Sequence, residues 1–453
     1  MSSAVNKTEF FRQLKSIVLP ISFQQFMLAA VSAADALMLG YLSQEALGAV
    51  SLATQIQFIF NLFLAAITIG LSMFAAQYWG KRDRNSVEKF LGIALRPTFV
   101  VSVLFFGATL FVPELLMRIF TSETTLIEKG TEYLKAVSFS YLFCGVSQVY
   151  LCIMKNCGLA GRGTLISSVS VVLNIVLNAL LIFGLCGFPA LGIAGAALAT
   201  VITRVIELAW IFYEMAQMKR VKIRIAYILN PACKFRKDFW RYTFPVLGNE
   251  LVWGCGFSMY TVILGHLGSN AVAANAVANV VKNLIVCFCL GLCTGGGIIV
   301  GYELGRDNME DARIYGAWLT RISVIWGIVS GLFLLCIAPL VLKYSNLNEQ
   351  ANEYLCWMMF FCTVYMVGKS VNCMTIAGIF CAGGDSRFGF FCDLVTIWCI
   401  TIPLGLLGAF VFDLPVVAVY LIVNSDELLK LPAVWWRYHK YYWLNNLTIQ
   451  ETA

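Results

Sequence analysis

The sequence has little charge and almost no histidine. Asp, Glu, Lys and Arg together make up 13% of the 453 residues, about half the fraction that is typical of a soluble domain. The two histidines, His266 and His439, lie far apart, which disfavours a Ser-His catalytic triad and a histidine-based zinc site. The sequence also lacks a Cys-x-x-Cys pair and a Walker A motif, so direct use of ATP is not expected. We therefore predict that the protein is not an enzyme and has neither a metal site nor a cofactor.

The sequence is instead rich in apolar runs that are long enough to span a membrane. Hydrophobic residues make up 60% of the chain, and a helix of about 20 apolar residues spans a bilayer. Turn residues and charges divide the apolar runs into twelve predicted helices. Their ranges are 15–41, 46–79, 89–112, 128–153, 164–185, 191–217, 238–266, 271–303, 313–342, 350–377, 387–411 and 415–436. The sequence therefore predicts an all-α integral membrane protein with twelve transmembrane helices.

Basic residues are distributed unevenly between the connectors of these helices. Most of the 32 Lys and Arg lie in both tails and in the connectors after even-numbered helices, including the run from Lys219 to Arg241. The opposite connectors hold Arg118, Lys129 and Lys343. Because cytoplasmic loops carry the excess of Lys and Arg, we expect a multi-pass protein of the plasma membrane with both termini in the cytoplasm. The net charge of +7 belongs to these loops, so the lipid bilayer is the expected partner and nucleic acid is not.

The sequence repeats itself at an interval of 225 residues. The matched pairs include Pro20 with Pro245, Gly40 with Gly265, Gly70 with Gly295 and Gly80 with Gly305. Two like halves related by an axis along the membrane normal are typical of transporters that rock two bundles around a central site. We predict an N-terminal six-helix bundle at 1–217, a basic cytoplasmic linker at 218–241, a pseudo-symmetric C-terminal six-helix bundle at 242–436 and a cytoplasmic tail at 437–453.

Several short motifs keep their order and spacing along almost the whole chain. They are Asp35 five residues before Gly40, Ala46-Leu47-Gly48-Ala49, Gly70-Leu71-Ser72, Gly161-Arg162-Gly163-Thr164, Gly192-Ile193-Ala194-Gly195-Ala196-Ala197 and Gly383-Gly384-Asp385-Ser386. Together they resemble the landmarks of the multidrug and toxic compound extrusion (MATE) family. The resemblance implies a V-shaped pair of bundles and a secondary antiporter. Such a protein exports small organic compounds, often cationic, in exchange for H+ or Na+ by alternating access. We expect this chain to act as a monomer.

Polar residues of the first predicted bundle are candidates for ion coupling, because a charge inside a span is costly and is therefore a functional candidate. Asp35 lies among alanines, and apolar surroundings favour a carboxyl group that can take up a proton. Oxygen neighbours would make it a sodium ligand instead. Asn174 and Asn178 share one helix face, and Thr200 adds a hydroxyl. These amides are either part of the ion site or hydrogen-bonding contacts between helices.

The resemblance bears on the choice between the two ions. Many relatives carry a second acid at the position of Asn178, so this chain has one formal negative charge there instead of two. One carboxylate suffices for proton coupling, whereas tight sodium binding is less expected.

The second predicted bundle carries a different polar set, which we expect to line a substrate cavity. Positive charge comes from Lys282 and Lys369, and negative charge from Glu250 and Asp393. Glu250 is expected to pair with one of the lysines, in either a structural or a gated ion pair. The uncharged members are Asn275, Asn279, Asn283, Tyr365 and Asn372. Two lysines in the cavity would favour an anionic or zwitterionic substrate.

Other residues are assigned to bending, to pairing and to the membrane surface. Pro20 and Pro245 are predicted hinges, because proline removes a helical hydrogen bond. Arg204 and Glu207 are three residues apart on one helix and should pair. We expect Lys430 to extend from a helix end to the interface. The aromatic residues between Trp435 and Trp443 should form an interfacial belt.

Three alternative functions share part of this pattern. A flippase for lipid-linked oligosaccharide would need basic cavity residues in both halves, whereas the lysines predicted to be buried lie in the second. An ion channel would not show saturable counterflow coupled to a gradient. An intramembrane enzyme would need paired catalytic residues, which the sequence does not offer.

Overall fold

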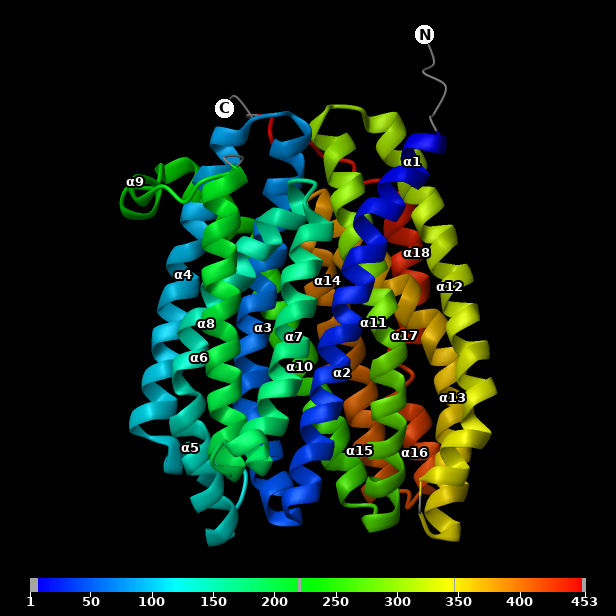
Figure 1. Cartoon of the computed structure of the whole chain (residues 1–453). Helices are drawn as coiled ribbons and strands as arrows, with labels where there is room; N and C mark the ends of the chain where they lie inside the picture. Colours follow the sequence, from blue (N-terminus) through cyan, green and yellow to red (C-terminus); the bar gives the residue numbers. More distant parts are fainter. Residues whose placement is uncertain (1–6, 219–220, 346, 450–453) are drawn as a thin grey trace. The chain divides into compact units, whose positions relative to one another are not determined.

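The computed structural model describes residues 7–218, 221–345 and 347–449. These residues form helices joined by short connectors, and the described ranges contain no strand (Figure 1). Within them, ten helices are long and apolar enough to cross a membrane. The predicted all-α membrane architecture is confirmed.

The first half supplies six of these ten spans. The first span is built from α1 (Lys7–Gln13), the π-helical segment η1 (Leu14–Val18) and α2 (Leu19–Leu42). The next elements are α3 (Gln44–Gly80), α4 (Arg84–Phe111), α5 (Pro113–Arg118), α6 (Thr124–Asn156), α7 (Ala160–Phe183), η2 (Leu185–Gly187), α8 (Gly192–Met218) and the short α9 (Ile225–Leu229). Helix α4 begins where the Asp83 carboxylate accepts a hydrogen bond from the Ser86 amide at 3.1 Å, a typical N-cap.

The second half supplies the other four spans. Its elements are α10 (Cys233–Gly265), α11 (Ser269–Gly305), α12 (Met309–Tyr344), α13 (Glu349–Asn372) with η3 (Cys373–Phe380), α14 (Ser386–Asp393) with η4 (Leu394–Thr401) and α15 (Ile402–Phe410), α16 (Val416–Val423), α17 (Asp426–Leu429) and α18 (Leu431–His439). All twelve predicted helices therefore correspond to helical segments of the structure. Helix α10 lies outside the ten, because its most apolar stretch also contains polar residues such as Asn249 and Glu250 and has a lower mean hydropathy.

The last predicted helix, 415–436, is broken rather than continuous. Helix α16 ends where the side-chain amide of Asn424 donates to the carbonyl of Tyr420 at 3.0 Å. Lys430 then separates α17 from α18. Pro432, at the start of α18, has no backbone N–H to continue the preceding turn. The break places Asp426, Glu427 and Lys430 next to one another in the interior.

The chain packs as two compact units. Within the described residues, unit 1 contains the segment up to Gln25, Ala76–Lys81 and the chain from Arg241 onward, and unit 2 contains Phe26–Ala75 and Arg82–Trp240. The start of the first span and the end of α3 thus pack with helices of the second half. The predicted boundaries at 217, 241 and 436 stay a prediction.

The repeat is visible as a pair of equivalent contacts inside unit 1. A Cβ atom at Gly80 would overlap the carbonyl oxygen of Tyr302, and one at Gly305 would overlap that of Gln77. Tyr302 lies 225 residues after Gln77, as Gly305 does after Gly80, so each contact is the copy of the other. Glycine is required because only its missing side chain allows the ends of α3 and α11 to approach so closely.

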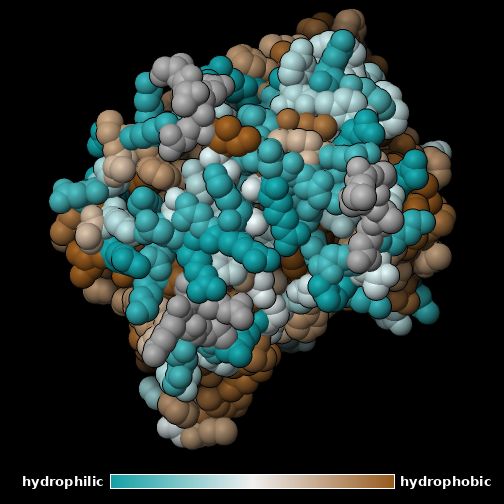
Figure 2. Space-filling model, turned by 90° about the horizontal axis from the view of Figure 1, so that it is seen from above, coloured by the Kyte–Doolittle hydropathy of each residue, from teal (hydrophilic) through white to brown (hydrophobic). Residues whose placement is uncertain are grey.

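The C-terminal segment 440–449 packs onto unit 1. Trp443 is fully buried, and its indole lies where a side chain on Gly316 would be. The buried side chain of Gln77 donates to the carbonyls of Ala382 and Asn445 at 2.7 and 3.1 Å, and it accepts from the Leu447 amide at 2.6 Å. The expected interfacial belt is therefore wrong for Trp443. Helices α1 and α18 lie at the same end of unit 1 (Figure 1), and Figure 2 shows hydrophilic side chains gathered on the face at that end.

The glycine contact makes a testable prediction. Gly305→Ala and Gly80→Ala should each lower the thermal midpoint of the purified protein to a similar extent, because each methyl group meets a backbone oxygen. Overpacking of this kind costs about 1–3 kcal/mol. The control is Gly107→Ala in α4, where a Cβ atom would meet nothing within 4 Å. Equal midpoints for all three variants and the parent would contradict the contact.

Candidate functional site

Unit 2 holds a polar chain that links α2 to α7. The side-chain amide of Asn178 donates to Asp35 Oδ1 at 2.6 Å and to Asn174 Oδ1 at 3.2 Å. Asn174 and Asn178 are buried and Asp35 is partly buried. The structure thus brings together three of the four residues predicted for ion coupling. Their role in coupling stays a prediction.

Two features of this chain bear on its chemistry. The buried Oδ1 of Asn178 has no hydrogen-bond partner among the described residues, so an acceptor is left for a proton donor or a cation. No described Lys or Arg forms an ion pair with Asp35. An acid held only by amides can change charge without leaving a basic partner unpaired.

The fourth predicted residue is not connected to this chain. Thr200 donates its hydroxyl proton to the carbonyl of Ala196 on its own helix at 3.1 Å. Elsewhere in unit 2 the expected pair of Arg204 and Glu207 is confirmed, with 2.7 Å between Nη1 and Oε2.

An apolar layer covers one side of the polar chain in unit 2. Leu39, one turn after Asp35, and Ile182, one turn after Asn178, pack in a buried cluster with Val50, Ile193 and Ala196. Helices α2 and α7 end directly after this layer, at Leu42 and Phe183. The layer therefore lies between the polar chain and the ends of these two helices.

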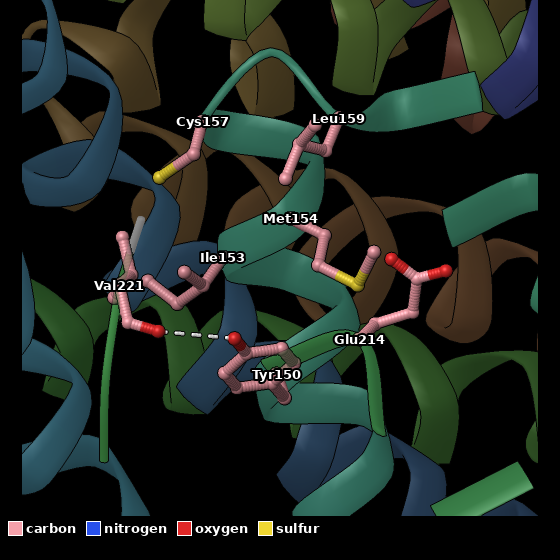
Figure 3. A pocket seen from close by; sticks show the side chains of 7 residues that line it. All are labelled: Tyr150, Ile153, Met154, Cys157, Leu159, Glu214 and Val221. Atoms are coloured by element: carbon pink, nitrogen blue, oxygen red, sulfur yellow. Dashed lines mark hydrogen bonds between the residues drawn. The ribbon is translucent and has the colours of Figure 1, made fainter. Parts of the chain in front are cut away.

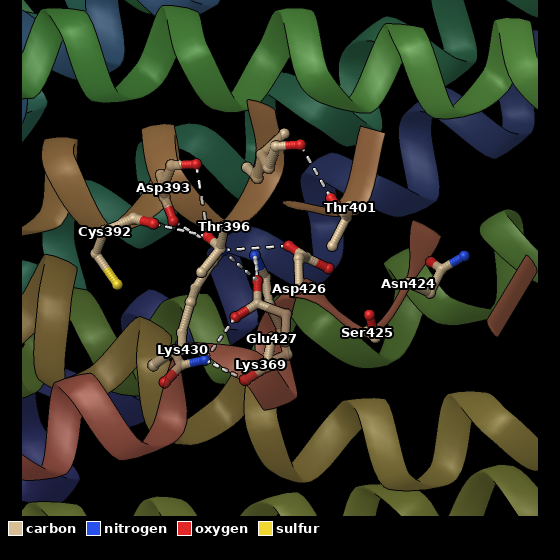
Figure 4. Close-up of polar contacts among 12 residues, drawn as sticks. Lys369, Cys392, Asp393, Thr396, Thr401, Asn424, Ser425, Asp426, Glu427 and Lys430 are labelled. Atoms are coloured by element: carbon tan, nitrogen blue, oxygen red, sulfur yellow. Dashed lines mark hydrogen bonds and ion pairs between the residues drawn. The ribbon is translucent and has the colours of Figure 1, made fainter. Parts of the chain in front are cut away.

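Unit 1 contains a network of buried ion pairs (Figure 4). Lys430, 2% exposed, lies 2.7 Å from Asp393 Oδ1 and 3.2 Å from Asp426 Oδ2. Lys369 pairs with Glu427 at 3.0 Å. The amide of Asn372 donates to Glu427 Oε2 at 2.9 Å. The network joins α13, the α14–η4 boundary and the broken end of the chain.

The network corrects two expectations and adds two residues. Lys430 is buried among carboxylates, so its assignment to the membrane interface is wrong. Glu250 forms no ion pair among the described residues, because Lys369 is bonded to Glu427 instead. Asp426 and Glu427 were not predicted as site residues, although they lie four and three residues before Lys430 in a predicted span, which is the spacing of helical ion pairs.

The remaining predicted cavity residues have different environments. Lys282 is buried, and its Nζ lies 3.4 Å from Asn424 Oδ1 and 4.9 Å from the centre of the Tyr365 ring. Asn275 is buried, Asn279 is partly buried and Asn283 is exposed. The structure therefore brings Lys282 and Tyr365 together, whereas the asparagine stripe of α11 does not share one environment.

The two predicted hinge prolines also differ. Pro20 is the second residue of α2 and follows the π-helical segment η1 directly. Pro245 lies inside α10. Their action as hinges stays a prediction.

A small pocket of unit 2 lies apart from these clusters (Figure 3). Its lining is mainly apolar and consists of Tyr150, Ile153, Met154, Cys157, Leu159, Glu214 and Val221. The Tyr150 hydroxyl donates to the carbonyl of Val221 at 3.1 Å, and Glu214 pairs with Arg162 at 3.1 Å. None of the residues predicted for coupling or substrate binding lines it.

Comparisons with known proteins cover most of the chain. The model of the MatE family matches residues 20–180 and 245–407, one match in each half. The "Uncharacterized transporter YisQ" of Bacillus subtilis is 20% identical over 437 residues, 95% of this chain and 94% of that protein. The "Multidrug resistance protein MdtK" of Photorhabdus laumondii is 23% identical and covers 87% of this chain and 86% of its own.

A solved structure from Pyrococcus furiosus has a closely similar fold. Its TM-score is 0.87 at 19% identity, over 95% of both chains. That protein is described as a "MOP superfamily transporter" whose "reverse polarity of binding pocket suggests different function".

The ion-pair network makes a prediction about stability. Lys430→Met should destabilise the protein strongly, because it leaves Asp393 and Asp426 without their cation, and breaking a buried pair costs about 3–5 kcal/mol. The matched control is Arg118→Met, whose pair with Glu114 is exposed and contributes about 0–1 kcal/mol. The measurement is the thermal midpoint in detergent. Equal small shifts for the two variants would show that the network is not required.

Proposed function

The chain belongs to the MatE family, and we propose that it is a secondary antiporter that exports small organic compounds in exchange for H+ or Na+ by alternating access. The observation that carries the proposal is Asp35, a carboxylate inside a membrane span whose direct bond is to the amide of Asn178. A charge at this depth is costly unless it has a function or a partner of opposite sign.

The geometry supports H+ as the coupling ion. An ionised Asp35 accepts a hydrogen bond from Asn178, whereas a protonated Asp35 gains a donor. The unpartnered Oδ1 of Asn178 provides an acceptor for that donor once the amide turns. Sodium would need several oxygen ligands, and this site has one carboxylate. The membrane potential supplies about 2.3 kcal/mol for each charge that crosses 100 mV.

Transport also involves a conformational change and a fixed orientation of the chain in the membrane. Uptake and release of the ion at Asp35 would alternate the access of the substrate site, with bending at Pro20 and Pro245. Both termini lie in the cytoplasm and the protein acts as a monomer. The flippase alternative is not favoured, because the ion pairs of unit 1 already engage Lys369 and Lys430.

Coupling at Asp35 can be tested in proteoliposomes with separately imposed pH and sodium gradients. Asp35→Asn keeps an acceptor for Asn178 but cannot change charge, so gradient-driven transport of organic dyes should fall to the level of empty vesicles. Glu114→Gln makes the same chemical change at an exposed acid and should transport like the parent. Undiminished gradient-driven transport by Asp35→Asn would remove this residue from the mechanism.

The proposed topology can be tested with two exposed native cysteines. Cys186 follows α7, and Cys233 begins α10 in the basic linker. A membrane-impermeant maleimide should label Cys186 in intact cells, whereas Cys233 should react only after permeabilisation. Peptide mapping distinguishes the two sites, and Cys186→Ser and Cys233→Ser confirm the assignment. The reverse pattern would place the termini outside.

A further inference from the structure

Lys282 of α11 is a buried cation with few partners. Lys282 is 4% exposed, and it forms no ion pair among the described residues. Its one hydrogen bond there is a long one, at 3.4 Å to Asn424 Oδ1. An ammonium group has three N–H donors, and a buried charge needs a counter-charge or hydrogen-bond acceptors. Lys282 therefore has N–H donors that a ligand could use.

The other lysines of this interior are already neutralised. Lys369 is bonded to Glu427, and Lys430 is bonded to Asp393 and Asp426. Glu250, the remaining acid of the predicted cavity, pairs with none of the three lysines. Asp426 and Glu427 are thus held by other cations.

Aromatic rings lie next to this ammonium group. Lys282 Nζ lies 4.9 Å from the centre of the Tyr365 ring and 5.8 Å from that of Phe257. Trp253 stacks on Phe257 at 5.9 Å and also faces Lys369 at 5.2 Å. The three rings come from α10 and α13 and are partly exposed. The ammonium group therefore has no carboxylate partner among the described residues and lies beside rings that are not fully buried.

We propose that Lys282 and these rings form a subsite for an organic anion with an apolar ring system. A carboxylate or sulfonate would accept hydrogen bonds from Lys282 Nζ, and charge-assisted bonds of this kind are about twice as strong as neutral ones. The apolar part would pack against Trp253, Phe257 and Tyr365. The inference rests on the proposed transport function and names the substrate class of that site.

The same arrangement disfavours an organic cation. A cationic group beside Lys282 would meet a like charge, and Asp426 and Glu427 could bind it only by leaving Lys430 or Lys369. Unfavourable placement of like charges is a common source of specificity. The subsite therefore selects against the lipophilic cations that the family resemblance implies.

Binding to the purified full-length chain tests the subsite directly. The probes are 2-naphthalenesulfonate and 2-naphthyltrimethylammonium, which share one ring system and differ in charge. The parent should bind the sulfonate more tightly than the ammonium compound. Lys282→Met should weaken sulfonate binding by about tenfold or more, whereas Lys282→Arg should retain it. Lys343→Met, at an exposed position near the end of α12, should bind like the parent.

Two results would overturn the subsite. The first is equal sulfonate binding by Lys282→Met and the parent. The second is that the parent binds the ammonium compound more tightly than the sulfonate. The second result needs no variant, so the test remains valid if Lys282→Met does not fold. Gradient-driven uptake in proteoliposomes separates this inference from the transport proposal. Sulfonate binding without any driven transport would reject the transport function alone, whereas driven transport of the ammonium compound with no sulfonate binding would reject the subsite alone.

Discussion

The cost of an unpaired charge in a membrane interior explains the polar groups of both units. A charged side chain in a span is tolerated when it is paired, hydrated or used. In unit 1, Lys430 and Lys369 are held by Asp393, Asp426 and Glu427, and the last helix is broken where these acids lie. Asp35 is bonded to the amide of Asn178, and Lys282 lies beside the amide oxygen of Asn424 and the Tyr365 ring. The paired charges are neutralised in this way, whereas Asp35, Glu250 and Lys282 form no ion pair among the described residues.

The two halves share a backbone contact and differ in their polar interiors. Gly80 and Gly305 bring the ends of α3 and α11 together through equivalent positions of the repeat. Gln77 at this contact also binds the C-terminal segment through Asn445 and Leu447. The repeat therefore supplies a common frame. Within that frame the first half holds the chain of Asp35, Asn174 and Asn178, whereas the second holds the ion pairs of Lys369 and Lys430.

Features that depend on local spacing could be predicted from the sequence. The helices follow from the lengths of apolar runs, the pair of Arg204 and Glu207 from their spacing, and the likeness of the halves from the 225-residue interval. The two asparagines of the Asp35 cluster share a helix face for the same reason. Contacts between distant segments could not be predicted. The bond of Lys369 to Glu427 crosses 58 residues, and the burial of Trp443 depends on glycines in other helices.

The central claim is that Asp35 changes its protonation state during transport while the paired carboxylates do not. Infrared difference spectra of the reconstituted protein, recorded between alkaline and acidic conditions, detect the C=O stretch of each carboxyl group that becomes protonated. The account predicts that Asp35→Asn removes one carboxyl band from the spectrum of the parent. Identical carboxyl bands in the parent and the variant would contradict it, because Asp35 would then keep one charge throughout.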